Sequence, residues 1–150
     1  MVIIGCGNRQ RSDDAAGILV AEKLRKLGIK AEICTRGCAE LIEVWTGAKD
    51  VIVVDAVVSG APVGTIRAWN GREAPLSVRT PPSTHGLGVA EAIELARVLD
   101  RLPSRLRVYG IEGRRFELGA ELSPEVNAAI DEVTGKIVGD VRAERMPLTG

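Results

Sequence analysis

The segment Val51-Ile52-Val53-Val54 places four β-branched residues in a row and ends at Asp55. A strand with one exposed face would alternate apolar and polar side chains, so an unbroken apolar run predicts a strand that is buried on both faces. Such a sheet needs helices above and below it. Aromatic residues make up only 3% of the chain, so its core must consist of Val, Ile, Leu and Ala, which suits the same arrangement. The segment therefore favours an α/β fold.

The remaining segments alternate between strand-like and helix-like patterns. Strands are predicted over 2–6, 31–35, 64–69 and 105–111, and helices over 12–27, 39–45, 89–99 and from 124 onward, with a fraying tail from 141. Only about eight residues separate Asp55 from the 64–69 strand, too few for a parallel crossover, so that strand should run antiparallel. We expect one domain over 1–150, a three-layer α/β/α sandwich around a mostly parallel five-stranded sheet with one antiparallel strand.

Side-chain patterns also predict how the helices begin and which faces they bury. Ser12 is predicted to cap the first helix, where Leu27 is the last residue at helical spacing before Gly28. In the 89–99 helix, Leu99 closes the apolar face. The last helix is expected to open with Ser123 as its cap and proline in its first turn. Its buried face should comprise Val126, Ala129, Ile130, Val133 and Ile137.

The charge balance and the cysteine content indicate which classes of partner and which cellular compartment to expect. Lys plus Arg number 20 and Asp plus Glu number 20, which argues against a nucleic-acid or anionic-membrane partner. No apolar run approaches the ~20 residues of a membrane span, and Met1 is followed directly by apolar residues without the basic region of a signal peptide. The three cysteines, Cys6, Cys34 and Cys38, are an odd number that favours reduced thiols, buried as small hydrophobic residues. We therefore expect a cytoplasmic protein.

The glycine pair Gly5 and Gly7 follows the first strand and precedes a helix, as in a dinucleotide-binding turn. The full fingerprint G-x-G-x-x-G requires a third glycine at position 10, which is Gln10 here. Two glycines also allow a tight turn after a buried strand, and this structural interpretation is the stronger one. No nucleotide cofactor is expected.

Three polar positions stand out, and each also has an ordinary structural interpretation. Asp14, beside Asp13, lies where a carboxylate would complement the dipole of the first helix. Asp55 either caps the turn after its strand or faces a cleft. His85, the only histidine, lies where a loop becomes a helix and can be either a hydrogen-bonded structural residue or a ligand.

Taken together, these positions predict a shared site. Asp14 follows the first strand, Asp55 ends the third, and the loop of His85 can reach the same edge of the sheet. Two carboxylates and one imidazole suit a divalent metal such as nickel, zinc or iron and leave coordination positions open for a substrate or water. We expect the three side chains to line one cleft bordered by the Gly5–Gly7 turn.

Several motifs, in order along the chain, resemble those of the hydrogenase maturation endopeptidases. The similar segments are Ile3-Ile4-Gly5-Cys6-Gly7-Asn8, Asp13-Asp14 with Gly17, Val53-Val54-Asp55-Ala56, Ser83-Thr84-His85-Gly86-Leu87-Gly88, Gly110-Ile111-Glu112 and Gly119-Ala120-Glu121-Leu122-Ser123-Pro124. The resemblance covers roughly residues 2 to 138. Some members of the family have glutamate at the position of Asp14, and the glycine that usually follows the acidic pair is Ala15 here.

The resemblance implies a phosphorylase/hydrolase-like sandwich and an endopeptidase that removes a C-terminal peptide from the nickel–iron hydrogenase large subunit after nickel insertion. Nickel would then come with the substrate, with Asp14, Asp55 and His85 as its ligands and catalytic residues. Either nickel polarises the scissile carbonyl or activates a water, or a carboxylate such as Asp14 acts as general base. Two rival functions remain open: a nickel-sensing binding module that cuts nothing, and a related peptidase that acts on another precursor.

Overall fold

The computed structural model describes residues 1–73 and 88–145 of the chain. Its strands are β1 (Val2–Cys6), β2 (Glu32–Cys34), β3 (Asp50–Val57), β4 (Ile66–Asn70) and β5 (Arg105–Glu112). A short 3₁₀ helix, η1 (Ser12–Ala15), precedes the helices α1 (Ala16–Lys26), α2 (Cys38–Trp45), α3 (Val89–Val98) and α4 (Pro124–Arg145). The predicted elements are therefore present, with boundaries shifted by one to three residues at most of their ends.

The five strands form one sheet in the order β2-β1-β3-β5-β4. β1 pairs in parallel with β2 and β3, and β3 pairs in parallel with β5 over its whole length. β4 pairs antiparallel with β5, with Ala68 opposite Tyr109. The prediction of one antiparallel strand is confirmed. The short connection after β3 leads past its neighbour β5 to the far edge of the sheet.

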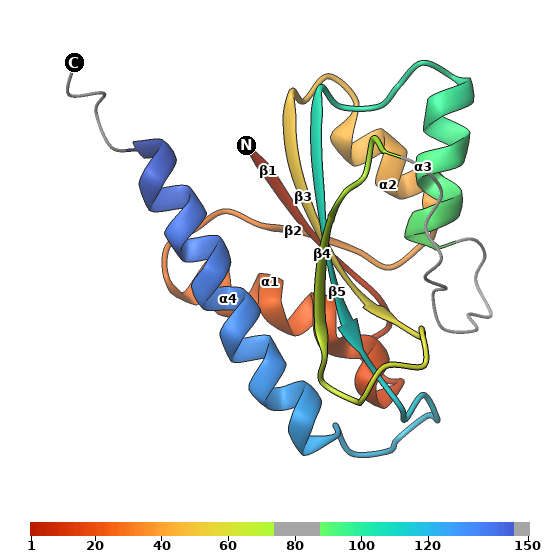
Figure 1. The fold of residues 1–150 in the computed structure, drawn as a ribbon, viewed down its shortest axis with the longest axis vertical. Helices are drawn as coiled ribbons and strands as arrows, with labels where there is room; N and C mark the ends of the chain where they lie inside the picture. The colour runs from red at the N-terminus through yellow and green to blue at the C-terminus, as the bar shows by residue number, and fades with distance from the viewer. Residues whose placement is uncertain (74–87, 146–150) are drawn as a thin grey trace.

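Helices cover both faces of the sheet, as the apolar run in β3 requires (Figure 1). One buried cluster joins α1 and α4 to side chains such as Ile52 and Val54, and a second joins α2 and α3 to side chains such as Val51 and Val53. Alternate residues of β3 thus contribute to opposite cores, and all four are fully buried. The three-layer α/β/α sandwich is confirmed, and so is the predicted buried face of α4.

Some details of the helices differ from the prediction. Ser12 does not cap a helix: it lies inside η1, and its hydroxyl donates to the carbonyl oxygen of Glu121 at 2.7 Å. Leu27 and Leu99 are exposed by 62% and 48%, because each lies at the C-cap, where the chain has turned away from the sheet. The first part of the tail predicted from 141 is helical, since α4 continues to Arg145 with Val141 buried against the core, and 146–150 lie outside the described residues.

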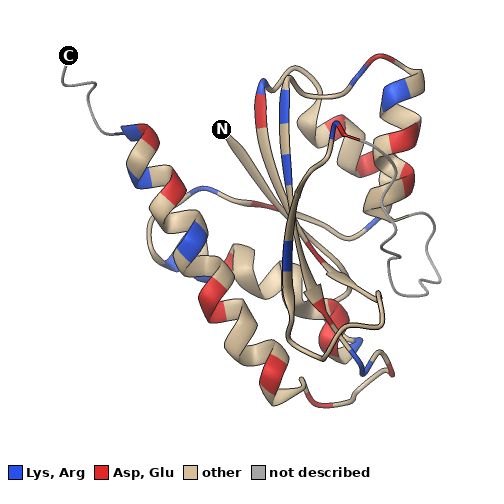
Figure 2. Ribbon diagram, viewed as in Figure 1, with Lys and Arg blue, Asp and Glu red and all other residues tan. Residues whose placement is uncertain are grey.

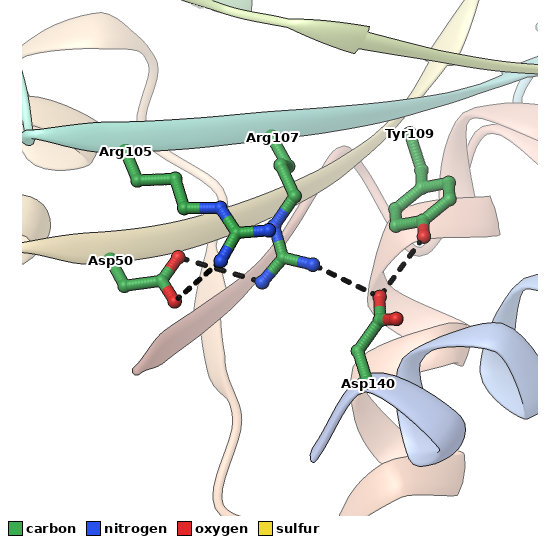
Figure 3. Close-up of polar contacts among 5 residues, drawn as sticks. All are labelled: Asp50, Arg105, Arg107, Tyr109 and Asp140. Carbon is green, nitrogen blue, oxygen red and sulfur yellow. Dashed lines mark hydrogen bonds and ion pairs between the residues drawn. The ribbon is translucent and has the colours of Figure 1, made fainter. Parts of the chain in front are cut away.

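A polar network fixes α4 against the sheet at the end opposite the candidate site (Figure 3). Asp140 of α4 accepts hydrogen bonds from Arg107 Nη1 at 3.1 Å and from the Tyr109 hydroxyl at 3.2 Å. Arg107 also lies 3.5 Å from Asp50 of β3, which in turn pairs with Arg105 at 3.9 Å. Elsewhere, acidic and basic residues are interspersed along α3 and α4 (Figure 2). None of the helices described is long and apolar enough to cross a membrane.

Candidate functional site

The two predicted carboxylates lie at the edge of the sheet formed by the carboxyl ends of the parallel strands. Asp14 is in η1, which follows β1, and Asp55 is in β3, two residues before the end of that strand. Both are buried, with 7% and 6% of their surface exposed. Acidic segments of η1 and of the strand ends lie close to one another at this edge (Figure 2). This is the position where open α/β sheets bind their ligands.

Glycines allow η1 and α1 to approach the strands this closely. A Cβ atom on Gly17 would lie 2.3 Å from the carbonyl oxygen of Val54 and 2.4 Å from that of Cys6. At Gly7, where φ is +143°, a Cβ would lie 1.9 Å from the backbone oxygen of Asp14 and 3.7 Å from its Oδ1. The glycine turn therefore borders the Asp14 carboxylate, as expected, and close packing accounts for its glycines.

Burial changes the protonation of both carboxylates. It raises the pKa of Asp14 to about 6, against the opposing influence of the nearby Arg11 guanidinium. The pKa of Asp55 is raised well above its usual range, first by burial and then by the negative charge of Asp14, although the amide of Ala56 donates to its Oδ1 at 2.9 Å. Burial thus leaves the anionic form of each carboxylate poorly solvated, and the charge of Asp14 further disfavours ionisation of Asp55.

This environment attracts a cation. A divalent ion would replace the missing water and remove the repulsion between the two carboxylates, and oxygen ligands of this kind accept nickel, zinc or iron. His85 lies outside the described residues, so its place in the site is still a prediction. Within 1–73 and 88–145, no three His, Cys, Asp or Glu side chains gather in a geometry that would hold a metal ion.

Asp13, next to Asp14, has a purely structural role. Its carboxylate accepts hydrogen bonds from the amides of Arg114 and Arg115 at 2.8 and 2.9 Å and from the amide and hydroxyl of Ser123, both at 2.8 Å. Burial alone would raise the pKa of Asp13, but these four donors hold it below its usual value. Asp13 thus fixes the loop before α4, which leaves Asp14 as the candidate site residue of the pair.

Cys6 and Cys34 lie opposite each other on β1 and β2 and are buried, whereas Cys38 is only partly buried. All three are free thiols. The pKa of Cys6 is raised well above its usual value, mainly by a hydrogen bond with Cys34, then by burial and by the charge of Asp55. A thiol with a raised pKa stays protonated and is a poor nucleophile. The prediction that cysteines fill the core holds for Cys6 and Cys34.

Two acidic residues near this edge were not anticipated. Glu91, in the first turn of α3, contributes to the raised pKa of Asp55, so its charge faces the same region. Glu112, at the end of β5 and 2% exposed, accepts hydrogen bonds from the amide and hydroxyl of Ser59. Their positions at a helix start and a strand end were visible in the sequence, but their orientation depends on the neighbouring strands.

A buried pair of carboxylates beside the carboxyl ends of a mostly parallel sheet defines a small α/β sandwich protein with its candidate site at that edge. The family model for hydrogenase maturation proteases matches residues 20–140, and the chain belongs to this family. Protein FrxA of Pyrococcus furiosus is 32% identical over 133 residues, which cover 87% of this chain and 96% of that protein. The hydrogenase 2 maturation protease of Escherichia coli is 28% identical and covers 95% of this chain and 90% of its own length.

Solved structures agree with this assignment. The hydrogenase maturating endopeptidase HybD from Escherichia coli superposes with a TM-score of 0.77 at 26% identity, covering 96% of this chain and 93% of that one. HybD from Thermococcus kodakarensis, described as a [NiFe] hydrogenase maturation protease, has the same fold with a TM-score of 0.73 at 23% identity. The resemblance found in the sequence is thereby confirmed.

Proposed function

We propose that this protein removes the C-terminal extension of a nickel–iron hydrogenase large subunit precursor after nickel insertion, and that it recognises the nickel carried by that substrate. One observation carries the proposal: in a member of a protease family, Asp14 and Asp55 are buried at one strand edge with pKa values raised by burial. Their desolvated charges favour binding of a cation over binding of a neutral peptide.

Asp14, Asp55 and His85 would be the ligands that this chain offers to the substrate's nickel. Three ligands do not saturate the ion, so it can remain attached to the substrate while it contacts the protease. Sharing the ion couples recognition to nickel loading. Without the ion, the two carboxylates would face each other across the interface, and their repulsion would weaken the complex.

Two chemistries fit the cut itself. The shared nickel supplies Lewis acidity toward the scissile carbonyl or a water. Alternatively Asp14, whose pKa of about 6 lies close to neutral pH, accepts a proton from the attacking water. The buried, protonated thiol of Cys6 supplies no nucleophile for either route. The chain would act as one domain over 1–150, in the cytoplasm, on the folded precursor, without a nucleotide and without a nucleic-acid or membrane partner.

The test incubates the protein with nickel-loaded and nickel-free precursor and follows the mass of the large subunit. We expect trimming of the loaded form only. Asp55→Asn and His85→Ala should weaken binding of the loaded precursor at least tenfold. Asp14→Asn should also abolish trimming if that carboxylate moves the proton. Asp131→Asn, an exposed aspartate on α4, changes the charge equally and should cut like the unaltered protein.

Each other outcome selects a different function. Equal trimming of loaded and nickel-free precursor would exclude nickel recognition. Binding of the loaded precursor without any trimming would support a nickel-sensing binding module. Failure to bind this precursor, together with cleavage of another, would support a related peptidase with a different substrate.

A further inference from the structure

A groove of about 550 Å³ lies beside the segment that carries Asp14. It is lined by Asn8, Arg9 and Gln10 from the loop after β1 and by Thr35 and Arg36 from the loop after β2. This volume is in the range of sites that hold small ligands or a few residues of peptide. Among the described residues, the lining includes two arginines, Arg9 and Arg36, and no acidic residue.

Backbone hydrogen bonds connect the groove directly to the candidate site. The amide of Asn8 donates to the carbonyl oxygen of Asp14 at 3.1 Å, and the amide of Gly7 donates to the carbonyl oxygen of Cys34 at 3.2 Å. The first bond joins the groove wall to the segment that carries Asp14, and the second holds the loop after β2 beside it. A peptide chain bound at Asp14 therefore needs only a few residues to enter the groove.

The two arginines are available to a ligand. Arg36 is 83% exposed, and its only ion pair among the described residues is a loose one to Glu40, at 3.7 Å. Glu40 is itself held in place, since its Oε1 accepts hydrogen bonds from the amides of Thr35 and Arg36 at 2.9 and 3.2 Å. Arg9 is 57% exposed and uses one guanidinium nitrogen, Nη1, to contact Glu22 at 2.6 Å. Both guanidinium groups retain N–H donors that can bind a carboxylate.

We propose that this groove binds the segment of the substrate on the C-terminal side of the cut, through carboxylates that include its terminal one, at Arg9 and Arg36. The inference rests on the proposed function for its substrate, and it adds the position and the chemical character of the leaving peptide. A leaving segment that carries carboxylates, its terminal one included, would meet the free N–H donors of these guanidinium groups beyond the carboxylate pair. The reversed orientation would place carboxylates against Asp14 and Asp55, which repel them.

The experiment measures peptide binding in the absence of nickel and of any precursor. The probe is a fluorescent six-residue peptide in which glutamate alternates with alanine and the C-terminal carboxylate is free. Its partner has glutamine in place of glutamate and an amidated C-terminus. We expect the acidic probe to bind at least tenfold more tightly by fluorescence anisotropy, and 0.5 M salt to remove most of the difference.

Charge-reversal variants place the binding in the groove. Arg9→Glu combined with Arg36→Glu should lower the affinity for the acidic probe at least tenfold. Arg9→Gln with Arg36→Gln provides a milder pair, with a loss of at least threefold, in case the reversal affects folding. The control is Lys26→Glu with Lys30→Glu, which changes the net charge equally at two exposed positions, the end of α1 and the loop after it, and should change the affinity less than twofold.

Equal binding of the two probes, or unchanged binding after both arginine substitutions, would overturn the proposal. A comparable loss in the Lys26 and Lys30 variant would also overturn it, because the effect would then be one of net charge alone. These readouts are independent of the proposed nickel dependence. If the protein trims nickel-free precursor, nickel recognition fails while the groove result stands, and if only the probes fail, nickel recognition stands.

Discussion

Ser123 donates two hydrogen bonds to the Asp13 carboxylate, one from its amide to Oδ1 and one from its hydroxyl to Oδ2, both at 2.8 Å. The two residues are 110 positions apart, and both are fully buried. The contact closes the start of α4 against η1. It therefore fixes η1, the segment that also carries the neighbouring Asp14.

Asp13→Asn should lower the free energy of unfolding by about 2–4 kcal/mol, because the amide group would place an N–H donor against buried N–H donors. Ser123→Ala, which removes only the hydroxyl donor, should cost about 1 kcal/mol. Urea denaturation at pH 7 measures both. Equal losses in the two variants would contradict the central role of the carboxylate.

Because of the Asp13 carboxylate, we expect the stability of the protein to fall in acid. The pKa of Asp13 in the folded protein lies below its ordinary value of 3.8, so the contribution of Asp13 is present above pH 3.8 and is lost as the pH falls through the lower folded value. Stability curves should show a steeper loss below pH 3.8 for the unaltered protein than for Asp13→Asn. Parallel curves would exclude this linkage.

Asp14 should make the stability of the protein depend on pH in the opposite direction. Its folded pKa of about 6 exceeds the ordinary value of 3.8, so its contribution is fully present below pH 3.8 and is lost as the pH rises through 6. Asp14→Asn should therefore stabilise the protein at pH 7.5, by about 1–2 kcal/mol after allowance for solvent screening near the cleft. Thermal unfolding from pH 4 to 8 measures the effect, with Asp131→Asn as the control. A variant as stable as the control at pH 7.5 would contradict it.

Gly17→Ala should disturb the approach of α1 to the sheet. The added Cβ would lie within 2.5 Å of the carbonyl oxygens of Val54 and Cys6, which are backbone atoms of buried strands and cannot move aside. We expect a loss of about 3 kcal/mol. The matched control is Gly139→Ala in α4, which meets no atom within 4 Å and should gain about 0.5–1 kcal/mol from helix propensity. Similar changes in the free energy of unfolding of both variants would mean that the close approach of α1 to the strands does not exclude a side chain at position 17.

Asp140 should control the ionisation of Tyr109, the only tyrosine in the chain. The pKa of Tyr109 is raised above 10.0, first by burial and then by the charge of Asp140 and its hydrogen bond. Asp140→Asn removes that charge, so the pKa should fall toward 10.0. Absorbance at about 295 nm follows tyrosinate formation directly, and the unfolded protein in urea supplies the reference. An unchanged titration in the variant would show that burial alone sets the shift.

Much of the architecture follows from local patterns. The apolar run 51–54 required a sheet covered on both faces, and the short connection after Asp55 required one antiparallel strand. Because the same run is followed directly by Asp55, the sequence also predicted this carboxylate near the carboxyl end of its strand, where α/β sheets bind ligands. Motifs spread along most of the chain indicated the family. These features depend on residues that are close in the sequence, where periodicity and spacing act directly.

Tertiary structure decided which of two adjacent aspartates faces the site. Asp13 and Asp14 are equivalent in a local pattern. Asp13 is distinguished by the hydrogen bonds that its carboxylate accepts from Ser123 and from the 114–115 amides, more than 100 positions away. The groove likewise needs Arg9 and Arg36 from two loops that meet because β1 and β2 are neighbours. A sequence determines the order of polar groups along the chain, but their solvation and partners depend on which strands and loops pack together.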